Sequence, residues 1–326
     1  MSINHLVLIG GGHTNVLLMR EWFMYPKLKP KIPISIISRD SYLVYSAMFP
    51  SVISKLISLD ETLIDIRALA NNAKVSFIRG EVTNIDFQLK QISLKDRPSI
   101  DFSHLVLNYG SPTKVPREFK GLVKNKIAFS IKPFFKAYEL INNEDKNDSK
   151  KEPPFLIVGS GLAAIEIAFA LRKRWKNRSI KLVYKSNKLV KNFTRSLYRS
   201  DIELVKKLPF YYGKILLCTG NTSPKWIQKS FLELDSKGRV ITNQQLKLKN
   251  FLGIFAVGDC AVIDSSKRDS SGIFAVKVLD TLANNIQKDI KGELLKKWLP
   301  QRFGLQIVNS FPRKIPKAYA VYGNFV

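Results

Sequence analysis

The order of hydrophobic and polar positions at the start of the chain predicts a strand, a tight turn and a helix. In residues 6–15 an apolar run leads into three glycines, and the helical pattern VLLMREW follows directly. A β-branched run at residues 31–40 predicts a second strand parallel to the first, which completes a βαβ unit.

The same pattern returns at residues 154–175, where an apolar run ends in Gly159-Ser160-Gly161 before a long helical pattern. Residues 179–187 and 214–220 predict further parallel strands. Two such glycine turns in one chain are far more specific than one, and they predict two βαβ nucleotide sites. The predicted fold class is therefore α/β, with two Rossmann-like domains.

The segments between these patterns predict the remaining elements. A helix is expected near residues 65–71, then an antiparallel meander from residue 75 to a buried strand at 105–108 and a turn at Gly110. The polar segment 142–151 is the best linker candidate, and 189–207 is expected to be one helix. Only that helix and LPFYYG then separate residue 185 from the strand at 214–220, so the second domain is expected to be shortened.

Composition narrows the class of protein. Lys and Arg total 53 against 26 Asp and Glu, a net charge of +27. This charge is either a solvated compositional bias or an attraction to nucleic acid, an anionic bilayer or phosphorylated cofactors. We expect no specific nucleic-acid partner and a cytoplasmic protein, with peripheral contact to an anionic membrane left open. Cys218 and Cys260 stand far apart, which excludes a CxxC pair and a cysteine-based metal site.

The first glycine turn is suited to a pyrophosphate, because it presents backbone N–H groups at a helix N-terminus. Gly10 and Gly12 match a dinucleotide fingerprint, whereas Asn15 stands at the third position. The acidic residue that usually follows the second strand is replaced by Ser38, with Arg39 and Asp40 after it. Ser38 can still bond a ribose, and Arg39 either pairs with a phosphate or lies in solvent.

The complete order of motifs resembles the pyridine nucleotide–disulfide oxidoreductase superfamily, whose members bind two dinucleotides. The motifs are the two fingerprints, the meander, the glycine turns at Gly110 and Gly220, and AVGD at residues 256–259. Without a CxxC pair the chain resembles the type II NADH dehydrogenase branch. YSAMFP, DIRALA, SIKP, GIFAVK and PQRF are similar to the dehydrogenase-like module found fused to selenide–water dikinase.

This resemblance implies FAD in the first site and NADH or NADPH in the second. The implied FAD-binding residues are Gly10, Gly11, Gly12, His13, Ser38, Arg39, Gly110, Gly258, Asp259, Phe274 and Ala275. The implied NAD(P)-binding residues are Gly159, Gly161, Ala164, Lys185 and Gly220. Glu166 is the candidate catalytic residue near the nicotinamide and the flavin. The alternative is that Glu166 is an ordinary helical residue that faces solvent. No metal is expected. Tyr184 and Lys185 replace the acidic ribose position, which would tolerate the 2′-phosphate of NADPH.

The predicted domains are an FAD domain at 1–115 and 246–298, an NAD(P) domain at 116–245, and a C-terminal interface segment at 299–326. The expected activity is transfer of hydride from NAD(P)H to flavin N5, with electrons passed to a quinone or a sulfur or selenium compound. The alternatives are a degenerate FAD-binding partner protein and a polyanion-binding protein that uses the basic region 172–199. A homodimer is left open.

Overall fold

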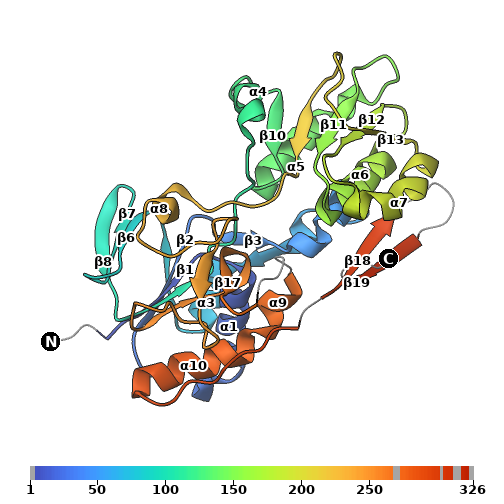
Figure 1. Cartoon of the computed structure of the whole chain (residues 1–326). Coiled ribbons are helices and arrows are strands. Elements are labelled where there is room, and N and C mark those ends of the chain that lie inside the picture. The colour runs from blue at the N-terminus through green and yellow to red at the C-terminus, as the bar shows by residue number, and fades with distance from the viewer. Residues whose placement is uncertain (1–3, 267–271, 302–303, 311–316, 323–326) are drawn as a thin grey trace. The chain divides into compact units, whose positions relative to one another are not determined.

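The computed structural model describes residues 4–266, 272–301, 304–310 and 317–322 (Figure 1). The chain forms two compact units. The first comprises Met1–Leu43, Ile64–Ser111 and Thr222–Gly304, and the second comprises Val44–Leu63, Pro112–Asn221 and Leu305–Val326. Both are α/β units built on a parallel sheet, which confirms the predicted fold class.

The first unit is built on a five-stranded parallel sheet of order β16-β9-β1-β2-β5. These strands are β1 (Leu6–Ile9), β2 (Ile34–Ser38), β5 (Ser76–Arg79), β9 (His104–Leu107) and β16 (Ile254–Ala256). The predicted meander begins only after β5, because Ser76–Arg79 follows a helix and returns parallel to β2. The antiparallel meander itself is β6 (Val82–Asp86), β7 (Gln91–Leu94) and β8 (Arg97–Asp101).

The central strand β1 is buried on both faces, since successive side chains point to opposite sides of a sheet. Leu6 and Leu8 face a core that includes residues of α1 (His13–Met24), α3 (Ile66–Asn72) and α10 (Leu279–Lys291). Val7 and Ile9 face the other core, to which the meander contributes Ile85, Ile92 and Leu94. The continuous apolar run at residues 6–9 is therefore the signature of a strand covered on both sides.

The remaining elements of the first unit are short. They are α8 (Lys225–Gln228), β15 (Val240–Thr242), β17 (Ala261–Ile263) and α9 (Gly272–Lys277). The helical stretch that starts at Gly272 is divided at Val278 into α9 and α10. A two-stranded ribbon of β3 (Tyr42–Val44) and β4 (Leu63–Asp65) stands where the chain passes between the units.

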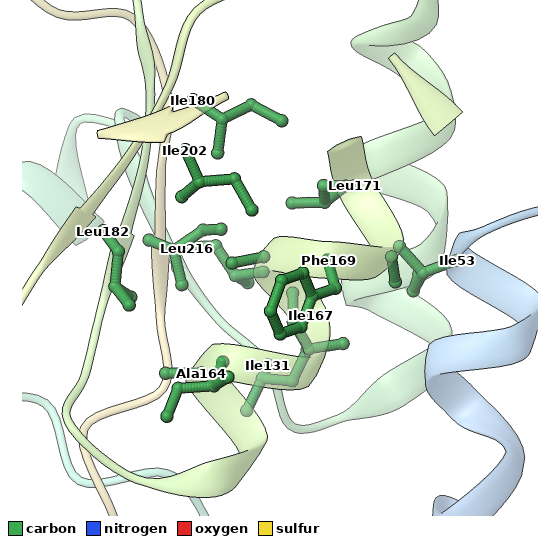
Figure 2. Packing of buried hydrophobic residues seen from close by; sticks show 14 of the residues in the cluster. Ile53, Ile131, Ala164, Ile167, Phe169, Leu171, Ile180, Leu182, Ile202 and Leu216 are labelled. Carbon is green, nitrogen blue, oxygen red and sulfur yellow. The ribbon is translucent and has the colours of Figure 1, made fainter. Parts of the chain in front are cut away.

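The second unit contains another five-stranded parallel sheet, of order β10-β14-β11-β12-β13. Its strands are β10 (Ala128–Ser130), β11 (Phe155–Val158), β12 (Ile180–Val183), β13 (Ile202–Val205) and β14 (Ile215–Leu217). Its helices are α2 (Phe49–Ile53), α4 (Lys120–Lys124), α5 (Phe134–Asn143), α6 (Leu162–Arg174) and α7 (Asn187–Arg199). Figure 2 shows Ala164, Ile167, Phe169 and Leu171 of α6 among Ile180, Leu182, Ile202 and Leu216 of the strands.

The prediction of one helix over 189–207 is wrong. The helix α7 ends at Arg199, and Ile202–Val205 forms β13, which pairs in parallel with β12. What the second unit lacks is a meander, because residues 206–214 alone connect β13 to β14. The sheet of the second unit has five strands although no meander lies between β13 and β14.

The predicted linker at 142–151 is also wrong, because this segment is a packed corner inside the second unit. Asp145 accepts hydrogen bonds from Arg174 Nε at 2.6 Å and Trp175 Nε1 at 2.8 Å. Glu144 Oε2 accepts from Arg178 Nη1 at 2.7 Å, and both side chains are buried. Burial raises the pKa of Asp145, but hydrogen bonds from Arg174, Lys55 and Trp175 outweigh it and hold that pKa below its ordinary value.

The C-terminal segment belongs to the second unit, where β18 (Leu305–Ser310) and β19 (Lys317–Tyr322) form an antiparallel hairpin. Val308 and Val321 of the hairpin are buried in the same core as α6. The compact units also differ from the predicted domain limits at 44–63, which groups with the second unit, and at 222–245, which groups with the first. The chain therefore crosses between units more often than the sequence pattern indicates.

Candidate functional site

The first glycine turn lies at the carboxyl end of β1, crowded by the strands on both sides. Gly10 has φ +90° and its N–H donates to Ile37 O of β2 at 2.8 Å. A Cβ on Gly10 would collide with Tyr109 Cα, and one on Gly12 with the Asn108 backbone oxygen. The glycines are therefore required by the close approach of β9 and its following residues.

Two buried asparagines hold this turn in place. Asn15 Nδ2 donates to Gly10 O at 2.9 Å, so the side chain at the third fingerprint position closes the turn from the helix. Asn108 Oδ1 accepts the Asn15 N–H at 3.1 Å, and Asn108 O accepts the Gly12 N–H at 3.1 Å. Asn15 thus takes the place of the third fingerprint glycine and stabilises the turn through its side chain. Asn108, which holds Asn15 in turn, could not be identified from the sequence.

Asn108 also connects the turn to the AVGD segment. Its Nδ2 donates to Val257 O at 2.9 Å, and Gly258 follows with φ +76°. A Cβ on Gly258 would lie only 2.5 Å from Asn108 Nδ2, so a side chain there is excluded. The half-buried Asp259 is placed next in the chain, at the same end of the sheet as Gly10 and Gly12.

The other residues predicted for the first site are distributed around this turn. Thr14 Oγ1 donates to Ala275 O at 2.8 Å, which fixes α9 beside α1, and Phe274 is buried. Ser38 ends β2 close to the turn, since a Cβ on Gly11 would lie 3.2 Å from Ser38 Oγ. In the structure Ser38 Oγ donates to Asp40 O at 2.8 Å.

Arg39 lies at the surface beside Asp40. Its side chain is 61% exposed and its Nε lies 3.5 Å from Asp40 Oδ2. Gly110 has φ +72° and no atom within 4 Å of the position of a Cβ, so space is open there. His13 is the half-buried first residue of α1.

The arrangement fits the pyrophosphate of a dinucleotide. The twelve-residue helix α1 begins after Gly12, which has no side chain that could accept a hydrogen bond from the backbone N–H groups of the first turn. The N-terminus of such a helix carries a partial positive charge and favours anions. Because a Cβ is excluded at Gly10 and Gly12, the surface of the turn is formed by backbone atoms.

The second glycine turn has the same construction in the second unit. Gly159 N–H donates to Val183 O at 3.0 Å, and a Cβ on Gly159 would lie 2.5 Å from Cys218 O and 2.9 Å from Ala164 Cβ. Ala164 at the third position therefore permits close packing of helix and strand. Gly161 is the cap residue of the thirteen-residue helix α6 and, like Gly220 with φ +90°, has open space around it.

The loop after β12 is tied to this turn by one hydroxyl group. Ser160 Oγ accepts the backbone N–H groups of Lys185 at 3.0 Å and Ser186 at 3.1 Å. The Lys185 side chain is exposed, and its Nζ forms an ion pair with Glu118 Oε1 at 2.9 Å. Tyr184 is half-buried and packs against the core of the unit.

Glu166 lies on α6 and faces the C-terminal hairpin. The Asn309 N–H of β18 donates to its carboxylate, whereas burial favours the neutral form. Burial is the larger effect and raises the pKa of Glu166 to about 7. A solvent-facing role on the helix, the alternative from the sequence, does not match this partly buried position.

The two cysteines are free thiols that lie in different units. Burial raises the pKa of Cys218 and of Cys260 to about 12. A thiol with so high a pKa is not a nucleophile near neutral pH. Cysteine chemistry is therefore not what these sites support.

Comparison with known proteins defines the class. Residues 4–204 match the family described as "Pyridine nucleotide-disulphide oxidoreductase". The chain belongs to this family, and it is an oxidoreductase whose cofactors are FAD and NAD(P)H. The family predicted from the sequence is thereby confirmed, and the link to the module fused to selenide–water dikinase stays a prediction.

Among similar curated proteins, NADH dehydrogenase-like protein YutJ of Bacillus subtilis is 23% identical over 91% of this chain and 86% of its own. Type II NADH:quinone oxidoreductase of Staphylococcus saprophyticus is 20% identical over 80% of this chain and 76% of its own. Human ferroptosis suppressor protein 1 is 22% identical over 66% of this chain and 65% of its own.

Solved structures share the fold. The sulfide:quinone oxidoreductase of Aquifex aeolicus superposes with a TM-score of 0.78 at 15% identity, over 98% of this chain and 87% of its own. Water-forming NADH oxidase of Lactobacillus brevis superposes with a TM-score of 0.73 at 14% identity, over 94% and 73%. Within the described ranges of this chain, no helix combines the length and apolarity needed to cross a bilayer.

Proposed function

We propose that this protein is an NAD(P)H dehydrogenase that passes electrons through FAD to a quinone. Similar proteins named for quinone reduction support the acceptor class, among them type II NADH:quinone oxidoreductase and demethylphylloquinone reductase NdbB of Synechocystis. When bound, FAD supplies the redox chemistry, accepting hydride from the nicotinamide and releasing electrons to the acceptor. The protein binds and orients both groups.

The observation that carries the proposal is the repetition of one glycine construction in both units. In each, a buried strand is followed by a glycine whose Cβ would collide with the residue after a neighbouring strand, and a helix begins three residues later, after a second glycine that has no side chain to cap it. Asn108 and Asn15 fix the first turn, and Ser160 fixes the second. We assign the first turn to FAD and the second to NAD(P)H.

Glu166 is the residue that we assign to proton handling beside the nicotinamide. It lies on α6, the helix that begins at the Gly161 cap, and its pKa of about 7 lets it hold or release a proton near neutral pH. The Asn309 N–H orients its carboxyl group. Glu166 thus differs from a helical surface glutamate in both burial and partner.

The preference between NADH and NADPH depends on Lys185. A 2′-phosphate at the end of β12 would compete with Glu118 for the Lys185 ammonium group, which lies 2.9 Å from Glu118 Oε1. The pair is exposed, so this competition is inexpensive. We therefore propose that both nucleotides are accepted, and that Glu118→Gln shifts the ratio of kcat/KM values toward NADPH.

The test is anaerobic reduction of the purified flavoprotein. NADH or NADPH is added without oxygen, the loss of flavin absorbance is followed, and soluble quinones are then offered as oxidants. Rapid bleaching followed by quinone-dependent return of colour supports the proposal. A flavin that stays oxidised would contradict the proposal and support a degenerate FAD-binding partner protein. Bleaching without reoxidation by quinone would exclude quinone as the acceptor and leave the NAD(P)H dehydrogenase activity standing.

A further inference from the structure

The two sheets of this protein differ in how their second face is covered. In the first unit the meander covers the face of β1 that carries Val7 and Ile9. In the second unit the equivalent face of β11 carries Leu156 and Val158, and it packs against Phe119, Leu122, Val123 and Tyr212. No meander lies between β13 and β14 there, and residues 206–214 cross alone.

This short crossing exposes large apolar side chains. Tyr212 packs into the sheet, but Phe210 and Tyr211 before it are 110% and 64% exposed, and Leu208 is exposed as well. Exposing a phenylalanine completely forgoes the burial that normally stabilises it. A cluster of this kind at the tip of a connection is typical of an interaction surface.

Basic residues are frequent in the two segments that meet at this connection. Segments 112–126 and 206–214 are linked by the hydrogen bond from Lys214 Nζ to Lys126 O at 2.8 Å. The two segments contain the following cations: Lys114, Arg117, Lys120, Lys124, Lys126, Lys206, Lys207 and Lys214. Their single carboxylate is Glu118, which is already paired with Lys185.

We propose that this surface, formed by residues 114–126 and 206–214, docks on an anionic lipid bilayer. Phe210, Tyr211 and Leu208 would enter the headgroup and acyl boundary, while Lys206 and Lys207 would pair with lipid phosphates. A fully exposed phenylalanine that follows the exposed Lys206 and Lys207 in the same connection favours a bilayer, because a bilayer supplies an apolar layer directly below an anionic one. Helix α4 lies in this surface beside the edge strand β10 (Figure 1).

The test is sedimentation of the full-length flavoprotein with vesicles of phosphatidylcholine alone or mixed with phosphatidylglycerol. We expect binding to the mixed vesicles that weakens with salt. Phe210→Ser with Tyr211→Ser should reduce partitioning at least about tenfold. Lys206→Gln with Lys207→Gln should reduce it about fivefold for each lysine removed.

Matched controls separate this surface from charge and apolarity in general. Phe231→Ser removes another fully exposed phenylalanine, and Lys150→Gln with Lys151→Gln removes two exposed lysines elsewhere in the second unit. Both controls should bind vesicles as the parent does, and all variants should keep NAD(P)H-dependent flavin bleaching.

Four results would overturn the proposal. Absence of binding to mixed vesicles is the first, and equal loss in the Phe231→Ser control is the second. The third is sedimentation of the free protein as a dimer that Phe210→Ser dissociates, which would assign the surface to a second copy. Loss of single-stranded oligonucleotide binding in the same variant, with vesicle binding intact, would likewise assign the surface to nucleic acid.

Discussion

Asn15 and Asn108 lie 93 residues apart in the sequence and are joined by a buried hydrogen bond of 3.1 Å from the Asn15 N–H to Asn108 Oδ1. Through its other groups Asn108 also binds the Gly12 N–H and Val257 O. The backbone oxygen and the side chain of this one residue thus connect the first glycine turn, the start of α1 and the AVGD segment. We propose that FAD binds at this junction.

Replacing Asn108 tests that junction. Asn108→Ala leaves the Asn15 N–H and Val257 O without this partner in a buried site, which should cost about 2–3 kcal/mol of unfolding free energy and weaken FAD retention. Urea unfolding and flavin content measure the two effects. Asn84→Ala, at an exposed meander position, is the control and should change neither. An Asn108→Ala protein with full flavin content and unchanged stability would contradict the role.

The second glycine turn allows stability to be separated from binding. A Cβ at Gly159 would lie 2.5 Å from Cys218 O, so Gly159→Ala should destabilise the second unit. A Cβ at Gly161 meets nothing within 4 Å, and its φ of −93° suits any residue. Gly161→Val should therefore keep the thermal midpoint and raise the KM for NAD(P)H at least about tenfold, as a side chain enters the space beside the helix N-terminus. An unchanged KM would exclude this turn as the nucleotide site.

Glu166 predicts a pH dependence of stability. Its folded pKa of about 7 lies above the ordinary 4.5, so the folded state binds the proton more tightly. The resulting stabilisation is complete below pH 4.5 and is lost as the pH rises through 7. Between those limits the group should contribute a fall of about 1–3 kcal/mol, given ~1.4 kcal/mol per pKa unit and partial solvent screening.

Glu166→Gln removes this titration and should flatten that part of the pH profile. The rate of flavin reduction against pH is the second readout, because a structural glutamate would alter stability without moving the kinetic profile. Glu166→Asp should restore a titrating group to the profile. A wild-type rate with no inflection near neutral pH would remove Glu166 from proton handling.

The ion pair between Asp145 and Arg174 is predicted to make a large contribution to the stability of the second unit. Asp145→Asn breaks contacts with Arg174, whose side chain is only 1% exposed, and should cost about 3 kcal/mol or more near neutral pH. Because the pKa of Asp145 is lowered, its stabilisation is present above pH 3.8 and fades as the pH falls through the folded pKa. Chemical unfolding at several pH values measures the difference, and Glu152→Gln serves as the control, since no ion pair of Glu152 is found among the described residues.

The sequence predicted the parts of the fold that depend on local pattern. The apolar runs of β1 and β11, and the helices α1 and α6 after the glycines, are continuous signals that survive without tertiary information. The strand β13 was missed because IELV is short and lies between charged residues, so that its pairing with β12 decides its structure. Residues 142–151 were interpreted as a linker because Arg174 and Arg178, which bind Asp145 and Glu144, come about thirty residues later in the sequence.

The site divides in the same way. Gly10, Gly12, Gly159 and Gly161 could be identified because a glycine after a buried strand is a local feature. Asn108 could not, since its importance comes from a partner in α1 and another after β16. The pairing of Lys185 with Glu118 is equally long-range and bears on the choice of nucleotide.

Anaerobic rapid mixing of the flavoprotein with NADH and NADPH tests most directly whether the first turn holds FAD and the second holds NAD(P)H. We predict that the parent protein is bleached with a rate that saturates with nucleotide concentration. Gly161→Val should keep the parent's flavin content and maximal rate while needing at least about tenfold more nucleotide for half-saturation. Flavin loss in Gly161→Val, or half-saturation equal to that of the parent, would contradict the assignment of the two turns.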